Sequence, residues 1–170
     1  GRKVIVPDWT TKDGKSAKYT MFSMVAENDR ITNAVITRTL RDMRPDNFNQ
    51  TIIDKWQEQA DSKPTFAYVE TTHEADELVR DFKARGIPAE AVHYRKGKHN
   101  TDSVLDNLAT GKTKVAVGAD MLSTGVNLRE LEVVLLAKNV GGTELAQIKG
   151  RPTREMTFHT PEGDRPKTHA

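Results

Sequence analysis

Two arginines and a glutamine near the C-terminus form the pattern Q-x-x-G-R-x-x-R, which runs from Gln147 to Arg154. Arg151 and Arg154 stand three residues apart, and on a helix this spacing directs both side chains to the same side. A guanidinium keeps its charge and offers five donors, so a pair suits a phosphate or a phosphoryl group in transfer. A solvated basic helix end explains the same residues equally well, because the helix dipole favours Arg there.

The densest basic cluster is His93-Tyr94-Arg95-Lys96-Gly97-Lys98-His99, at the end of a predicted strand. The whole chain has 26 Lys and Arg against 24 Asp and Glu, and its net charge of +2 does not by itself indicate nucleic-acid binding. Such binding must therefore rest on local clusters like this one. The alternative is a solvated loop, and Tyr94 suits either stacking on a base or packing at the rim of the core.

Bulk properties exclude several classes of protein. A length of 170 residues fits one domain, or one domain with an appendage. The chain has no cysteine, which excludes disulfides and thiolate chemistry, and its five histidines lack metal-ligand spacing, so no metal site is predicted. No apolar run approaches the roughly 20 residues that span a bilayer and no signal peptide is visible, so an intracellular protein is expected. Gly1 and the polar stretch 161–170 give the expectation that both ends are cut.

From Lys63 onward, strand-like and helix-like segments alternate. Gly86 and Pro88 end the first predicted helix, Thr101 is the predicted N-cap of the second, and Gly111 ends it. The order predicts an α/β domain with a mainly parallel sheet, which binds ligands beyond the carboxyl ends of its strands. The predicted strands are 66–69, 91–94, 115–117 and 133–137, and the predicted helices are 73–85, 102–110 and 143–149.

The first 62 residues have a different pattern. Strands are predicted at 4–6 and 19–25 around an Asp13-Gly14 turn. Helices are predicted at 30–43 and 48–59, with a break at Pro45. The expected division is therefore a connector region over 1–62, an α/β domain over 63–155 and a polar tail over 156–170.

Two segments imitate phosphate and metal sites. Thr110-Gly111-Lys112-Thr113 resembles the end of a P-loop, but the earlier glycine is replaced by Asp106. A helix precedes this segment and a strand follows it, which is the reverse of the required order, so a helix-stop turn is predicted. Glu74-Ala75-Asp76-Glu77 resembles a magnesium-binding acidic box but falls inside a predicted amphipathic helix. The sequence thus has neither a P-loop nor an acidic metal box.

Three segments in order resemble the second RecA-like domain of superfamily-two helicases and translocases. Residues 66–75 are similar to motif IV, residues 115–127 to motif V, and residues 147–154 to motif VI. The resemblance covers 63–155 and, within the superfamily, is closest to DNA-repair and restriction-type enzymes. It implies a RecA-like three-layer fold, a central mainly parallel sheet flanked by helices.

The resemblance also implies an ATP-binding role for the motif VI residues. Arg154 would be the arginine finger at the γ-phosphate, Arg151 a second phosphate or interdomain contact, and Gln147 a neutral hydrogen-bond partner. ATP with Mg²⁺ would be bound mainly by a preceding N-terminal RecA-like domain in cis, so the chain alone would not hydrolyse ATP. Gly150 would permit close approach of backbone at the cleft, and Gly125 would do the same for a loop that bridges nucleotide and nucleic acid.

Two residues depart from the family's pattern on the nucleotide-binding side. Asn127 stands where the family usually has an acidic residue that contacts the nucleotide sugar, and Pro152 stands where small residues are commoner.

Nucleic acid is the second implied partner, with DNA favoured. Lysine and arginine side chains would neutralise phosphates, while threonines and amides fix the register. The implied nucleic-acid contacts are Thr71, Thr72, Arg95, Lys96, Lys98, Ser123 and Thr124.

Two other functions are weighed against this motor domain. A non-catalytic interaction or regulatory module, which binds nucleic acid or a motor partner, fits the absent P-loop equally well. A small-molecule enzyme on a generic α/β sheet has little support, because no acid–base pair or nucleophile stands at the strand ends.

Overall fold

The computed structural model describes residues 2–93, 98–119, 131–139, 157–160 and 163–166. The chain divides into two compact units, one formed by 1–7 and 49–138 and the other by 8–48 and 139–170. Each unit has its own buried apolar residues. No helix within the described ranges is long and apolar enough to cross a membrane.

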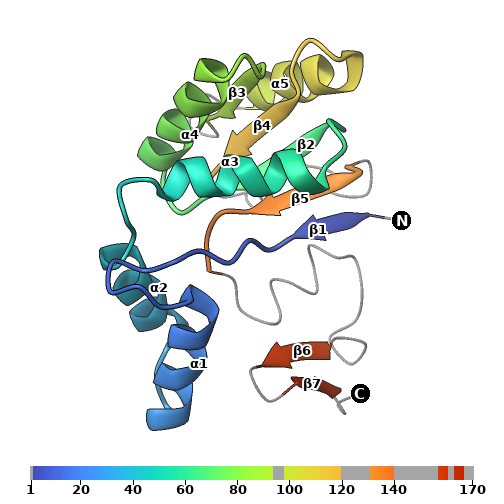
Figure 1. Ribbon diagram of the computed structural model, residues 1–170. Helices are drawn as coiled ribbons and strands as arrows, with labels where there is room; N and C mark the ends of the chain where they lie inside the picture. The colour runs from blue at the N-terminus through green and yellow to red at the C-terminus, as the bar shows by residue number, and fades with distance from the viewer. Residues whose placement is uncertain (1, 94–97, 120–130, 140–156, 161–162, 167–170) are drawn as a thin grey trace. The chain divides into compact units, whose positions relative to one another are not determined.

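Among the described residues, the first unit contains a five-stranded parallel sheet in the order β1-β5-β2-β4-β3 (Figure 1). Its three central strands are buried along their whole length, because a parallel sheet is covered on both faces. Such strands appear in a sequence as continuous apolar runs, and the strands predicted from 66, 91, 115 and 133 are confirmed. The strands are β1 (Lys3–Ile5), β2 (Thr65–Tyr68), β3 (Ala89–Val92), β4 (Val115–Gly118) and β5 (Val133–Leu136).

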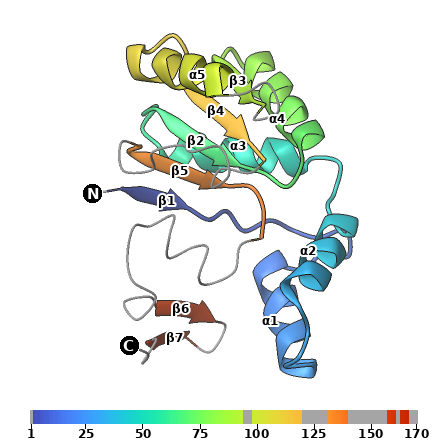
Figure 2. The same ribbon diagram turned by 180° about the vertical axis from the view of Figure 1, so that it is seen from behind.

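Helices cover both faces of this sheet. α4 (Thr72–Ala84) crosses from β2 to β3, and α5 (Lys98–Thr110) returns from β3 to β4. Because the two connections run in opposite directions and such crossovers are right-handed, the helices lie on opposite faces, as Figures 1 and 2 show. α3 (Phe48–Gln59) lies on the same face as α4, where Trp56 meets Phe82 edge to face, 5.5 Å between ring centroids. The α/β class with a parallel sheet flanked by helices is confirmed.

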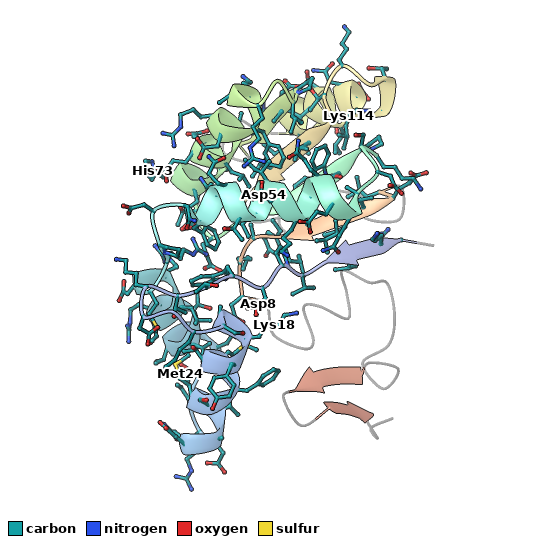
Figure 3. The ribbon with its side chains drawn as sticks, in the orientation of Figure 1. Asp8, Lys18, Met24, Asp54, His73 and Lys114 are labelled. Atoms are coloured by element: carbon teal, nitrogen blue, oxygen red, sulfur yellow. The ribbon has the colours of Figure 1, made fainter. Side chains whose placement is uncertain are left out.

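Arg85, directly after α4, connects that helix to α3 through side-chain hydrogen bonds. Its Nη1 donates to Asp54 Oδ1 at 2.7 Å and to Gln57 Oε1 at 2.9 Å. Its Nη2 donates to Gln50 Oε1 at 2.7 Å. These donors come from one planar fork, so the contact fixes the orientation as well as the distance of the two helices. Asp54 is labelled on α3 in Figure 3.

A second polar contact between α3 and α4 centres on Asp81. Asn49 Nδ2 donates to Asp81 Oδ2 at 2.9 Å, and Arg80 Nε donates to Asp81 Oδ1 at 3.1 Å. Burial raises the pKa of Asp81, but the hydrogen bonds from Arg80 and Asn49 and the positive charges of Arg80 and Arg85 together outweigh it, so the pKa lies below its ordinary value. A lowered carboxyl pKa stabilises the folded chain above the unfolded pKa and ceases to do so as the pH falls through the folded one.

The two segments that imitate phosphate and metal sites have the predicted structural roles. Gly111 has a φ of +86° immediately after α5, and Thr113 N donates to Asn107 O at 3.1 Å, which is a helix-stop turn. Residues 74–77 lie inside α4. The predicted N-cap at Thr101 is wrong, because α5 already begins at Lys98 and Thr101 is buried one turn further on.

The second unit contains α1 (Ala17–Glu27) where a strand over 19–25 is predicted, so that prediction is wrong. The helix is fixed by its N-cap. Ser16 Oγ accepts from Tyr19 N at 3.1 Å and donates to Asp8 Oδ2 at 2.6 Å. Asp8 Oδ1 also accepts from Lys18 N at 3.0 Å, and Figure 3 labels both residues beside the first turn. Together these contacts satisfy the amide groups that a helix start leaves open.

The rest of the second unit follows the sequence more closely. α2 (Asn33–Asp42) begins after the N-cap Thr32, which confirms the predicted helix over 30–43 with shorter ends. β6 (Thr157–Thr160) and β7 (Gly163–Pro166) pair as an antiparallel hairpin within the expected polar tail. A small core joins α1 to α2 and consists of Ala17, Ile36 and Leu40, with Trp9, Met21, Met24 and Ile31 packed against it.

The boundaries of the two compact units differ from the domain boundaries that the motifs predict. β1 pairs with β5, and α3 packs on the sheet through Trp56, so both belong with the sheet although they precede residue 63. The boundaries at 62 and 155 follow motifs rather than contacts, and they stay predictions. The helix predicted at 143–149 lies outside the described residues.

Candidate functional site

The parallel strands of the sheet end at one common edge, which we call the carboxyl edge. The pairing places Tyr68 of β2 beside Gly118 of β4 and beside Leu136 of β5. The strands are therefore neighbours where the chain leaves them, and polar residues follow after one buried apolar residue, Val69 or Ala137. Glu70 and Thr71 follow β2, and Lys138 follows β5. In folds of this type, ligands bind at this edge.

Thr71 begins the helix that leaves the carboxyl edge, because it is the N-cap of α4. Its Oγ1 accepts from Glu74 N at 3.1 Å, and Glu74 Oε1 in turn accepts from Glu70 N at 3.1 Å. These two bonds resemble a capping box, which the sequence signals as T-x-x-E. Because the Thr71 hydroxyl is the acceptor in this bond, its O–H can still donate to a ligand. Thr72, the next residue, lies in the first turn and is half-buried. A helix start of this kind favours an anion.

Glu70 and Lys138 form an ion pair that joins the exits of β2 and β5. Lys138 Nζ lies 3.5 Å from Glu70 Oε1, and the side chains are only 14% and 16% exposed. The same Nζ lies 4.4 Å from the centroid of the Tyr68 ring, a cation–π contact. Glu70 Oε1 is buried and accepts no hydrogen bond within the described part of the chain. This pair is not predicted from the sequence, where the available signal is a lysine directly after an apolar strand.

His93 marks the exit of β3 and links it to both neighbouring helices. Its Nε2 lies 3.2 Å from Asp76 Oδ1 of α4, and its backbone N–H donates to Asn100 Oδ1 of α5 at 2.9 Å. The basic cluster 93–99 therefore begins at a residue that is fixed on both sides. Lys98 is the first residue of α5.

The predicted site residues divide into those that the structure describes and those that it does not. Thr71 and Thr72 lie together at the carboxyl edge, and Lys98 begins α5 beyond the exit of β3. Their contact with nucleic acid stays a prediction. The other predicted residues lie outside the described part of the chain, namely Arg95, Lys96, Ser123, Thr124, Gly125, Asn127, Gln147, Gly150, Arg151 and Arg154.

The described residues offer no centre for a nucleotide's metal ion. Over these ranges, no group of three or more His, Asp or Glu side chains stands close enough to hold a cation. Mg²⁺ in nucleotide sites is bound by carboxylates together with substrate phosphates.

A parallel sheet covered by helices on both faces, with polar residues along its carboxyl edge, is consistent with a RecA-like α/β domain. Residues 44–155, more than half of the chain, match the family described as "Helicase conserved C-terminal domain". The chain belongs to this family.

Several curated relatives are named as RNA helicases. The chain is 32% identical over 111 residues to "ATP-dependent RNA helicase DBP2" of Gibberella zeae, which covers 65% of this chain and 20% of that protein. It is 30% identical over 152 residues to the protein of the same name from Chaetomium thermophilum, covering 81% and 26%. It is 30% identical over 71 residues to "Probable ATP-dependent RNA helicase DDX17" of Homo sapiens, covering 42% and 10%. The matched part of the chain thus spans between 10% and 26% of the length of these three relatives.

These relatives confirm the helicase family and correct its subclass. The predicted likeness to DNA-repair and restriction-type enzymes is wrong, because the relatives are named as RNA helicases. Motifs IV, V and VI are common to the superfamily, so they identify the domain without distinguishing RNA from DNA. The preference for DNA has no support among these relatives.

Proposed function

We propose that the chain is the C-terminal motor domain of an ATP-dependent helicase or translocase that acts on RNA. The observation that carries the proposal is the family match over 44–155, which includes the whole Q-x-x-G-R-x-x-R segment. Arg154 is the arginine finger at the γ-phosphate, Arg151 a second phosphate or interdomain contact, and Gln147 a neutral hydrogen-bond partner. Gly125, Asn127 and Gly150 line the nucleotide side of the cleft.

ATP and Mg²⁺ are bound mainly by an N-terminal RecA-like domain of the same polypeptide. The chain's own sequence contains no P-loop, and its nearest imitation is a helix-stop turn at Gly111. When bound there, ATP supplies the phosphoryl group whose transfer to water releases energy for movement. Arg154 and Arg151 approach the phosphates as the two domains close, and they neutralise charge that develops in the transition state. The isolated chain is expected not to hydrolyse ATP.

The nucleic-acid track runs along the carboxyl edge. Thr71 and Thr72 stand at the positive end of α4, where backbone amides and hydroxyls suit a phosphate. The basic residues Arg95, Lys96 and Lys98 neutralise phosphates of the same strand, and Ser123 and Thr124 add hydroxyl donors. Closure and opening of the two domains shift this track relative to the N-terminal domain, so the strand moves by alternating grips. RNA is proposed as the substrate, because the relatives are named as RNA helicases.

The test of this function uses the full-length polypeptide that carries the chain. We expect it to hydrolyse ATP in the presence of Mg²⁺, with turnover stimulated by single-stranded RNA and less by DNA of the same sequence. Steady-state ATP hydrolysis is measured with each nucleic acid. Stimulation by DNA alone would contradict the choice of RNA, and no hydrolysis with either would favour the non-catalytic interaction module, which the absent P-loop also fits.

The basic loop gives a second prediction. Replacing Arg95, Lys96 and Lys98 by Ala removes three cations that neutralise phosphates, so single-stranded RNA binding weakens. The slope of log affinity against log salt also becomes shallower, by about 0.7 for each phosphate that is no longer neutralised. Fluorescence anisotropy titrations at several salt concentrations measure both quantities.

A charge-matched control separates direct phosphate binding from net charge. The exposed lysines Lys63, Lys83 and Lys112 are replaced by Ala, which removes the same three charges elsewhere. This control is expected to keep the wild-type salt slope. An equal decrease in both triple variants would place the track outside the basic loop.

A further inference from the structure

We propose that Glu70 and Lys138 are positioning residues that couple RNA contact to ATP turnover, an inference that rests on the proposed function. Glu70 directly precedes Thr71 and Thr72, the proposed RNA contacts. Lys138 follows β5, from which the chain continues to the proposed arginine finger at Arg154. The ion pair between them is thus a side-chain contact that joins the RNA side of the carboxyl edge to the strand leading to the ATP side, beside the backbone hydrogen bond from Ala137 N to Tyr68 O.

The surroundings of this pair restrict its side chains and shield its charges more than is usual for a surface ion pair. Lys138 Nζ is held from two directions, by Glu70 Oε1 at 3.5 Å and by the Tyr68 ring at 4.4 Å. Tyr68 is buried in β2, between β4 and β5. Both charged side chains are mostly screened from water, so their attraction is weakened less by solvent and salt.

The Lys55–Glu58 pair on α3 shows the contrast. Its Nζ and Oε2 lie 3.7 Å apart, and its side chains are 39% and 60% exposed. A pair of this kind contributes little, because water screens the charges and the side chains lose entropy when they meet. It is a suitable internal control, since it has the same two residue types.

Both ends of the Glu70–Lys138 pair are held by neighbouring elements. Glu70 N donates to Glu74 Oε1 in the first turn of α4, so the position of Glu70 depends on the helix start where RNA contact is proposed. On the other side, the residue after Lys138 is also held: Asn139 Nδ2 donates to Asn33 Oδ1 at 2.6 Å and to Thr37 Oγ1 at 3.2 Å. Networks of ion pairs and hydrogen bonds carry coupling between distant sites, and the pair is one such contact at this strand exit.

The test compares three variants of the full-length polypeptide: Glu70→Gln, Lys138→Met and the two together. The quantity measured is the ratio of kcat for ATP with saturating single-stranded RNA to kcat without RNA. We expect this ratio to fall by about tenfold in all three, within the range of about 5- to 150-fold typical of coupling between sites. RNA affinity, measured by anisotropy, is expected to stay near that of the wild type.

The double variant distinguishes coupling from damage to the fold. Each single variant leaves one mostly buried charge without its partner and lowers the melting temperature, whereas the double variant removes both charges and regains it. A double variant with restored melting temperature and a low stimulation ratio supports the proposal. A double variant with restored stimulation overturns it, because the pair would then act only through stability.

The control pair, Lys55→Met with Glu58→Gln, is expected to leave the stimulation ratio unchanged. A decrease there equal to that of the double variant would overturn the proposal. A wild-type polypeptide without RNA-stimulated turnover contradicts the proposed function itself. A stimulated wild type whose Glu70 and Lys138 variants keep the full ratio contradicts only the coupling role.

Discussion

We expect the Arg154→Ala variant of the full-length polypeptide to lose ATP turnover by about 10³-fold or more while it retains most of its affinity for single-stranded RNA. The guanidinium meets charge that exists mainly in the transition state, so its loss lowers kcat far more than it weakens binding of the ground state. The track residues are different side chains, which is why RNA affinity is spared. Turnover with saturating RNA and anisotropy without nucleotide give the two numbers.

Two controls accompany the Arg154 variant. Arg154→Lys keeps the positive charge but loses the planar fork, and it is expected to remain far below the wild-type rate. Arg38→Ala removes an exposed arginine from α2 and is expected to leave turnover unchanged. An Arg154→Ala variant with near-normal turnover would remove the finger assignment, and Arg151 would become the candidate to test next.

The sequence is sufficient to predict most elements of the sheet unit, because the physical signals there are local. Continuous Val- and Leu-rich runs such as Val133–Leu136 predict strands covered on both faces, and these are confirmed. Helix ends are set by residues such as Gly86, whose φ of +79° is a conformation that glycine adopts at low cost. Neither signal depends on residues far away in the chain.

The strand predicted at 19–25 shows where local signals are ambiguous. Its apolar residues come in pairs, Met21-Phe22 and Met24-Val25, which fit a helical period about as well as a strand. The helix is favoured by Asp8, which holds the N-cap Ser16 from outside the segment. The cap at Ser16, and not the period of the apolar residues, therefore distinguishes helix from strand here.

The candidate site is predictable only in its contiguous parts. Thr71 and Thr72 are predicted as nucleic-acid contacts because they follow one motif, and the structure shows in addition that Thr71 is the N-cap of α4. Their contact with nucleic acid stays a prediction. The Glu70–Lys138 pair was not found, because its members are far apart in the chain and meet only through the order β5-β2 within the sheet. Strand order is a long-range property, so a periodic pattern in one segment cannot supply it.

The packing of α3 and α4 on the sheet gives the prediction with the largest expected effect on stability. Phe82 of α4 is completely buried, and its ring meets Trp56 of α3 edge to face at 5.5 Å. Trp56 Nε1 also donates to Thr65 Oγ1 of β2 at 2.7 Å, so the two rings lie where both helices meet the sheet. We expect Phe82→Ala to lower the free energy of unfolding by about 3–5 kcal/mol, since it removes buried area and leaves a cavity.

That loss is a large share of the roughly 5–15 kcal/mol that stabilises a typical domain, so the midpoint of urea unfolding falls by roughly 2 M. Fluorescence of Trp56 reports the transition in a Trp9→Phe background, which removes the only other tryptophan of the chain. Phe82→Leu fills most of the same space and is expected to cost much less. An unchanged midpoint in Phe82→Ala would mean that the packing of α3 against α4 contributes little to the stability of the sheet unit.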